Sequence, residues 1–217
     1  MPGRAGPRKL SEPVRANCKR RWPRYARVGD EDHPVLKENG YEIPDEPEDA
    51  AALMKTLLQG PTNVLDKGSG NRDACIRLSL DDYLRAYRGL PWETPDRVES
   101  RRGEAAGDPF LEDDGFPLPV HRYGKLAPGI QPARGYNIDP NETYHSPDLP
   151  PPHNYLAFYI WLWEEFGCHV IIHLGKHGNL KWLPGKAIAL SECCFLEAVF
   201  GAIPQVHPFA AEPELSP

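Results

Sequence analysis

The chain has 217 residues, of which 40% are apolar and 26% charged, a composition typical of a globular domain with a modest core. Its 25 prolines and 19 glycines exclude an architecture of mostly long helices, because an interior proline costs a helix about 3 kcal/mol. The longest uncharged apolar run, Tyr155–Trp163, has nine residues, which is too short to predict a membrane span. The five cysteines form no CxxC motif, and the N-terminus lacks an apolar signal segment, so we expect a reducing, cytoplasmic location.

The net charge of −6 conceals two oppositely charged segments near the N-terminus. Residues 1–29 carry nine Lys or Arg and one Glu, whereas residues 30–49 carry nine Asp or Glu and one Lys. A basic arm over 4–27 is one feature of nucleic-acid-binding proteins, but its prolines and lack of periodicity favour a disordered tail. We therefore predict a disordered tail over 1–46, a folded part over 47–217, and no nucleic-acid partner.

Two amphipathic helices are predicted in the first half of the chain. Apolar residues at helical spacing predict a helix over 48–59. Its expected buried face comprises four residues, Ala51, Met54, Leu57 and Leu58. A second helix over 80–88 is expected to begin at Ser79, a favourable N-cap residue. Residues 61–76 are expected to form a loop, and residues 91–116, which show no periodicity, a surface loop or a frayed helix end.

The middle of the chain is predicted to be extended and irregular. Apolar positions at 118–120 and at Ile130 predict two short strands, which form a hairpin about Gly124. Seven prolines between 128 and 152 exclude a helix there, because both a proline and the residue before it resist helical geometry.

A helix–strand–loop–helix unit over 154–200 gives the chain its predicted α/β class. A helix that is apolar nearly all round spans 155–166 and is expected to be buried on most sides. A buried strand over 169–174, a loop over 175–185 and a helix over 191–199 follow. Ligands in α/β sheets sit beyond the carboxyl ends of strands, where the loop over 175–185 is expected.

Histidines are the candidate metal ligands, and seven of the eight follow residue 120. His173 and His177 flank a glycine-containing turn at the end of the predicted strand, where two imidazoles can converge on one metal ion. Alternatively, His169 and His173 lie on the core face of that strand and only form hydrogen bonds. The adjacent pair Cys193 and Cys194 and the lack of an HExxH motif make a zinc site a weaker hypothesis.

The glycine-rich segments do not match a phosphate-binding loop. Residues 67–70 lack the downstream Gly-Lys-Ser/Thr, and the segment Gly178–Lys186 has six residues between its glycines and Ala187 where a hydroxyl is needed. We therefore expect that this chain does not itself bind ATP.

Five sequence words carry a resemblance to a known family. They are GIQPARGYNIDP at 129–140, YHSPDL at 144–149, PHNYLAFY at 152–159, HLGKHGNL at 173–180 and WLPGK at 182–186. In order and spacing they resemble the large subunit of aerobic cobaltochelatase, the CobN family, which is related to the largest component of magnesium chelatase. The resemblance covers about residues 40–209 and does not include residues 1–38. Because that subunit is several times longer, the chain is interpreted as an irregular, proline-rich fragment of a larger multidomain chelatase subunit.

The resemblance implies insertion of cobalt into a corrin-type tetrapyrrole, hydrogenobyrinic acid a,c-diamide, during cobalamin biosynthesis. The large subunit then binds the macrocycle and the substrate cobalt ion, while two partner subunits, one of them an AAA+ ATPase, use ATP. His173 and His177 are our candidates for metal binding and proton transfer. The candidates for macrocycle binding are Arg134, Tyr136, His145, His153 and Lys186.

One departure from the family pattern concerns catalysis. Lys181 stands where the family usually has a Glu before the Trp of the WLPGK word, so a cation replaces a carboxylate. This departure and the short chain leave two alternatives open: a non-catalytic remnant or scaffold, and a magnesium-chelatase H-type subunit acting on protoporphyrin.

Overall fold

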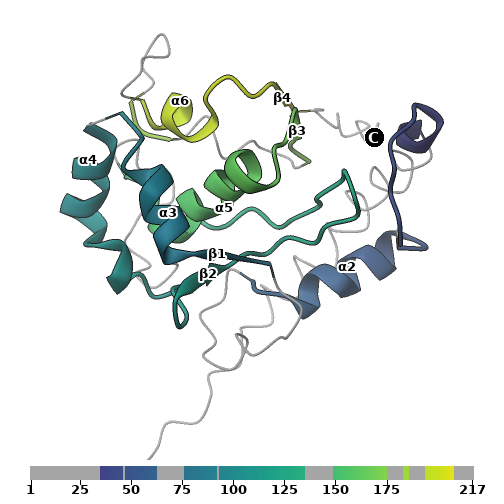
Figure 1. Ribbon diagram of the computed structural model, residues 1–217, viewed down its shortest axis with the longest axis horizontal. Helices are drawn as coiled ribbons and strands as arrows, with labels where there is room; N and C mark the ends of the chain where they lie inside the picture. Colours follow the sequence, from purple (N-terminus) through teal and green to yellow (C-terminus); the bar gives the residue numbers. More distant parts are fainter. Residues whose placement is uncertain are drawn as a thin grey trace, which may run out of the picture.

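The computed structural model describes residues 35–45, 47–62, 76–91, 93–134, 149–174, 183–185 and 194–207. Within these ranges, helices and two small two-stranded sheets are arranged about one hydrophobic core (Figure 1). None of the described helices is both long and apolar enough to cross a bilayer. The mixture of helices and short strands agrees with the expected α/β class in its coarse form, although the sheets are much smaller than in a doubly wound fold.

The helix α2, Ala50–Gln59, confirms the first predicted helix but not its buried face. It begins at Asp49, whose carboxylate accepts a hydrogen bond from the Ala52 N–H at 2.7 Å. Ala50 and Leu57 are buried, whereas Leu58 is 57% exposed. The buried face is therefore rotated by part of a turn from the predicted one.

The helix α3, Leu80–Tyr87, begins as predicted at Ser79, whose hydroxyl accepts the Asp82 N–H at 3.1 Å. The three residues before it form β1, Arg77–Ser79, which pairs antiparallel with β2, Gly115–Pro117. The three-residue strands lie in segments without a sequence signal for pairing, and neither was predicted. They join the start of α3 to a segment more than thirty residues away.

The segment 91–116 is more regular than the surface loop or frayed helix end that the sequence predicted. It contains the helix α4, Glu93–Arg102, and a 3₁₀ turn, η1, Ala105–Gly107. The helix was missed because it is nearly all polar and buries only Thr94 and Val98. Tertiary hydrogen bonds hold it instead: the Tyr87 hydroxyl donates to the Pro95 carbonyl at 3.1 Å.

The core is built on the predicted apolar helix, here α5, His153–Ile160, continued by a π-helical turn, η2, Trp161–Glu165. The hydrogen bond that defines this π-helical turn runs from the Phe166 N–H to the Trp161 carbonyl, five residues earlier, at 2.9 Å. Seven of the eight residues of α5 are buried. The helix lies between α3 and α6, Phe195–Phe200, and confirms the expectation of burial on most sides (Figure 1).

The expected hairpin about Gly124 is present as two isolated bridges, Val120 with Gly129 and Tyr123 with Leu126, rather than as two strands. Gly124 has φ +59° in the turn, and a Cβ there would lie 2.7 Å from the Glu42 carbonyl oxygen. The turn therefore requires glycine, both for its left-handed backbone and for the close approach of the segment at Glu42.

The strand expected over 169–174 is shorter and more exposed than predicted. The ordered pairing is limited to β3, Ile171–Ile172, which runs parallel to β4, Gln205–Val206. Ile172 is 47% exposed, so the expectation of a buried strand was wrong. The helix α6 is confirmed over its C-terminal part and is capped by Cys194, whose sulfur accepts the Glu197 N–H at 3.4 Å.

Candidate functional site

Two histidines meet at the carboxyl ends of the parallel strands. His173 directly follows β3, and its backbone N–H donates to the Val206 carbonyl at 2.8 Å. His207 directly follows β4, and the two imidazole rings lie with centroids 5.7 Å apart at an interplanar angle of 69°. The predicted location beyond a strand end therefore holds for His173, and the structure adds a second imidazole.

The environment of His173 favours its neutral form. The side chain is half-buried, and burial lowers the pKa of His173 below its ordinary value, with a smaller contribution in the same direction from His207. A neutral imidazole presents a lone pair, which is the form that binds metal ions and accepts protons. Of the described residues, no three His, Cys, Asp or Glu side chains gather into a metal-binding group.

His153, a predicted macrocycle-binding residue, lies inside the core. It is fully buried; its Nδ1 is 2.7 Å from the Tyr83 hydroxyl, and its Nε2 is 2.9 Å from the Gly103 carbonyl oxygen. A carbonyl oxygen can only accept, so Nε2 carries the proton, and in the neutral ring Nδ1 accepts from Tyr83. Both ring nitrogens are thus engaged within the fold.

Arg134 is also fully buried, next to the proline-rich segment. The guanidinium of Arg102 contacts the same region: its Nη2 donates to the Pro150 carbonyl at 2.9 Å and to the Arg134 carbonyl at 3.4 Å. Arg102 was not singled out from the sequence, because nothing there distinguishes it from Arg97 and Arg101 in the same polar helix.

The other predicted site residues lie outside the described part of the chain. They are Tyr136, His145, His177, Lys186 and the departure from the family pattern, Lys181. Whether these residues lie near His173 therefore stays a prediction.

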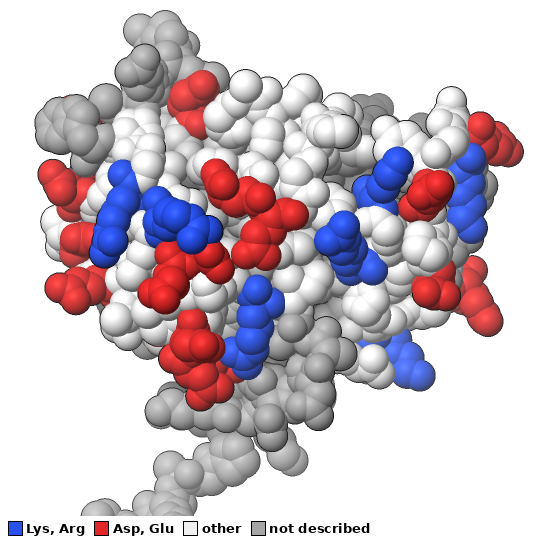
Figure 2. Space-filling model, in the orientation of Figure 1, with Lys and Arg blue, Asp and Glu red and all other residues white. Residues whose placement is uncertain are grey.

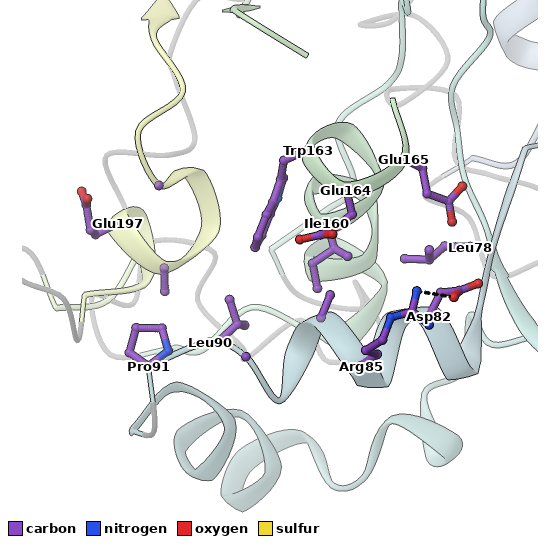
Figure 3. A pocket seen from close by; sticks show the side chains of 14 residues that line it. Leu78, Asp82, Arg85, Leu90, Pro91, Ile160, Trp163, Glu164, Glu165 and Glu197 are labelled. Carbon is purple, nitrogen blue, oxygen red and sulfur yellow. Dashed lines mark hydrogen bonds and ion pairs between the residues drawn. The ribbon is translucent and has the colours of Figure 1, made fainter. Parts of the chain in front are cut away.

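A groove of about 730 Å³ lies between α3, η2 and α6 (Figure 3). Its lining combines apolar groups such as Leu90, Ile160 and Trp163 with charged groups from all three elements. The four carboxylates in the lining are Asp82, Glu164, Glu165 and Glu197. The described candidates His153, Arg134 and His173 do not line this groove.

Two polar groups in the groove are in unusual surroundings. Burial raises the pKa of Glu165, and the nearby charge of Asp82 acts in the same direction. The indole N–H of Trp163 is buried without a hydrogen-bond partner among the described residues. Arg85 forms an ion pair with Asp82 at the rim, and acidic and basic side chains are interspersed on this face of the molecule (Figure 2).

His207 is the site residue that sequence reasoning missed. Its sequence signal was weak, because β4 has only two residues and its parallel partner lies more than thirty residues earlier. Only the pairing of Ile172 with Val206 reveals that the following two residues are neighbours.

Comparison with known proteins agrees with the sequence words. A family model described as CobN/Magnesium Chelatase matches residues 34–213. Aerobic cobaltochelatase subunit CobN is 51% identical in a Sinorhizobium species and 42% identical in Pseudomonas aeruginosa, over 175 residues each. Each match spans 81% of this chain but only 14% of the relative. The H-type subunit of magnesium chelatase from Cereibacter sphaeroides is 30% identical over 177 residues, 82% of this chain and 14% of that one.

A solved structure gives the same assignment. The catalytic subunit of cobaltochelatase from Mycobacterium tuberculosis superposes with a TM-score of 0.68 at 35% identity, covering 80% of this chain and 15% of that one. The family model extends over well more than half of the chain, and its match includes the strand-end histidines. The chain therefore belongs to the CobN/magnesium chelatase family.

Proposed function

We propose that this chain is part of the macrocycle- and metal-binding large subunit of an ATP-dependent cobaltochelatase. The reaction is insertion of Co²⁺ into hydrogenobyrinic acid a,c-diamide in cobalamin biosynthesis, in the cytoplasm. The observation that carries the proposal is the placement of His173 at a parallel strand end beside His207, within a segment 51% identical to a cobaltochelatase subunit. The lower identity of 30% to a magnesium-chelatase subunit favours cobalt as the substrate metal.

The proposed chemistry requires a metal ion to lose water while two pyrrolic N–H protons leave the macrocycle. Neutral imidazoles suit borderline divalent metals such as cobalt, whereas magnesium prefers oxygen ligands. His173 and His177 are proposed to hold the arriving ion and to accept protons as general bases. Two partner subunits, one an AAA+ ATPase, are proposed to supply the ATP-driven step, and the lack of a phosphate-binding loop in this sequence agrees with that division.

The candidates for macrocycle binding fall into two groups, those outside the described residues and those that the structure describes. Tyr136, His145 and Lys186 remain candidates for the periphery of the macrocycle. His153 is instead given a structural role, because both of its ring nitrogens are bonded inside the core. Arg134 is given a structural role on a different ground, because its side chain is fully buried.

The test is an absorbance titration of the 217-residue chain with the corrin substrate and with protoporphyrin. We expect a saturable spectral shift for the corrin and a weaker one for protoporphyrin, and cobalt insertion when the partner subunits and ATP are added to a full-length subunit carrying this sequence. A stronger shift for protoporphyrin would favour the magnesium-chelatase alternative. No shift with either macrocycle would contradict the proposal.

Lys181 decides between an active subunit and a non-catalytic remnant. A lysine near an arriving divalent ion opposes its binding, so Lys181→Glu is expected to raise cobalt insertion in the full-length subunit with its partners. The matched control is Lys125→Glu, an exchange of the same charge on the hairpin. Insertion by Lys181→Glu but not by the natural sequence would show that this chain is a remnant that kept the fold and lost the reaction.

A further inference from the structure

We propose that His173 and His207 together bind a divalent first-row transition-metal ion at the carboxyl ends of β3 and β4. The choice of cobalt as the biological metal rests on the function proposed above, whereas the paired site itself rests on geometry. His207 thereby becomes a metal-binding residue beside the predicted His173.

The distance between the rings fits a shared ion. A ring nitrogen binds a first-row metal at about 2.0–2.1 Å, so two imidazoles on one tetrahedral ion have centroids about 5–6 Å apart. The observed separation is 5.7 Å, and the interplanar angle of 69° leaves the two rings edge to face rather than stacked. The centroid separation therefore lies within the range that two imidazoles on one ion require.

The backbone holds the two histidines in register. Ile171 pairs with Gln205 and Ile172 with Val206. His173 and His207 are therefore the next residues after the two paired strands. The Ile171 N–H donates to the Pro204 carbonyl at 3.0 Å, and the His173 N–H donates to the Val206 carbonyl at 2.8 Å. Because side chains alternate along a strand, neighbours in register project from the same face.

The two histidines differ in exposure, and this difference suits the binding of an ion from solvent. His207 is exposed and can meet a hydrated metal ion from solvent, whereas His173 is half-buried. No third His, Cys, Asp or Glu of the described residues joins the pair, so water or substrate atoms would complete the coordination.

Two nitrogen ligands define the class of metal. Imidazole binds Co²⁺, Ni²⁺, Cu²⁺ and Zn²⁺, whereas Mg²⁺ prefers carboxylate and water oxygens. The site is therefore expected to discriminate against Mg²⁺ without any steric selection. A two-imidazole site also keeps coordination positions open, which suits an ion that must be passed to another ligand.

The experiment is a calorimetric titration of the 217-residue chain with CoCl₂ alone. His207→Ala is expected to raise the dissociation constant for Co²⁺ about tenfold or more, because one of two nitrogen donors is lost. His207 is exposed, so this variant should keep the fold, which circular dichroism checks. His173→Gln is expected to weaken binding to a similar extent, and the double variant should weaken it little further. A titration with MgCl₂ should show no binding that depends on either residue.

The matched control is His169→Ala. His169 is exposed and precedes β3, so it lies at the opposite end of the strand from His173, and its removal should leave Co²⁺ affinity unchanged. Unchanged affinity in His207→Ala would overturn the paired site, as would an equal loss in His169→Ala. The macrocycle titration is independent of this result: a corrin shift with an unaltered His207→Ala affinity would retain the proposed function and reject the pair. Loss of Co²⁺ binding without any corrin shift would retain the pair and reject the function.

Discussion

The centre of the molecule and the β3–β4 pair use histidine in two different ways. In the centre, His153 is fully buried between α3 and α4, and the protein itself occupies both ring nitrogens. At the strand pair, His173 and His207 face one another near solvent. The ring is the same, but burial with two protein partners makes it a structural bridge, whereas pairing at an open strand end makes it available to a ligand.

The two regions also differ in how they are stabilised. The centre contains one continuous apolar cluster in which Tyr83, Phe116 and Tyr155 are fully buried. Hydrogen bonds also join polar groups of its side chains, such as the Tyr83 hydroxyl and the His153 ring. The strand pair has two residues in each strand, and Ile172 and Val206 are nearly half exposed. Stability should therefore depend strongly on the centre and weakly on the strand pair.

The largest expected effect is that of His153→Ala. The change leaves the Tyr83 hydroxyl and the Gly103 carbonyl without their partner inside the core, so the free energy of unfolding should fall by about 2–5 kcal/mol. Urea denaturation followed by circular dichroism measures it. His169→Ala, at an exposed position, should change stability by no more than about 0.5 kcal/mol. Equal effects at the two positions would abolish the distinction between the regions.

An intermediate effect is expected for Gly115→Ala. A Cβ at Gly115 would lie 2.8 Å from the Leu78 carbonyl oxygen, so β1 and β2 must separate, at a cost of about 1–3 kcal/mol. The control is Gly107→Ala, where no heavy atom lies within 4 Å of the added Cβ. Thermal unfolding of both variants measures the difference, and an unchanged midpoint for Gly115→Ala would show that the two strands do not limit stability.

The smallest expected effect comes from removing one methylene in each region. Ile160→Val, at a position 1% exposed, should lower the free energy of unfolding by about 0.5–1.5 kcal/mol. Ile172→Val, at a position 47% exposed, should lower it by less than about 0.5 kcal/mol. Parallel urea titrations compare them. A larger loss at Ile172 would reverse the proposed order of the two regions.

The elements that could be predicted from sequence carry their own local signal. Ser79 has the side chain that caps a helix, and the apolar run at 155–163 has only one stable solution, which is burial on most sides. The helix α4 was not predicted, because it is nearly all polar and shows no apolar periodicity. Contacts such as the hydrogen bond from the Tyr87 hydroxyl to the Pro95 carbonyl become visible only in the structure. The three-residue strands β1 and β2 are too short to show alternation.

The candidate site divides in the same way. His173 was proposed from the sequence because it ends an apolar run before a glycine, and strand ends are where ligands bind. His207 could not be found, because its importance depends on a parallel pairing that no local pattern encodes. His153 was assigned to ligand binding from its place in a family word, and only the bonds to Tyr83 and Gly103 reveal its structural use.

The parallel pairing of β3 with β4 has a thermodynamic consequence. Parallel strands need a crossover, and here α6 lies between them in the chain, so the two histidines become neighbours only when this helix has packed against α5. An ion that binds the paired histidines and not the unpaired ones must stabilise the packed crossover by mass action, by about 2.7 kcal/mol at a hundredfold excess over its dissociation constant. The metal that the subunit is proposed to deliver would thus also act as a folding ligand for the C-terminal part of this segment.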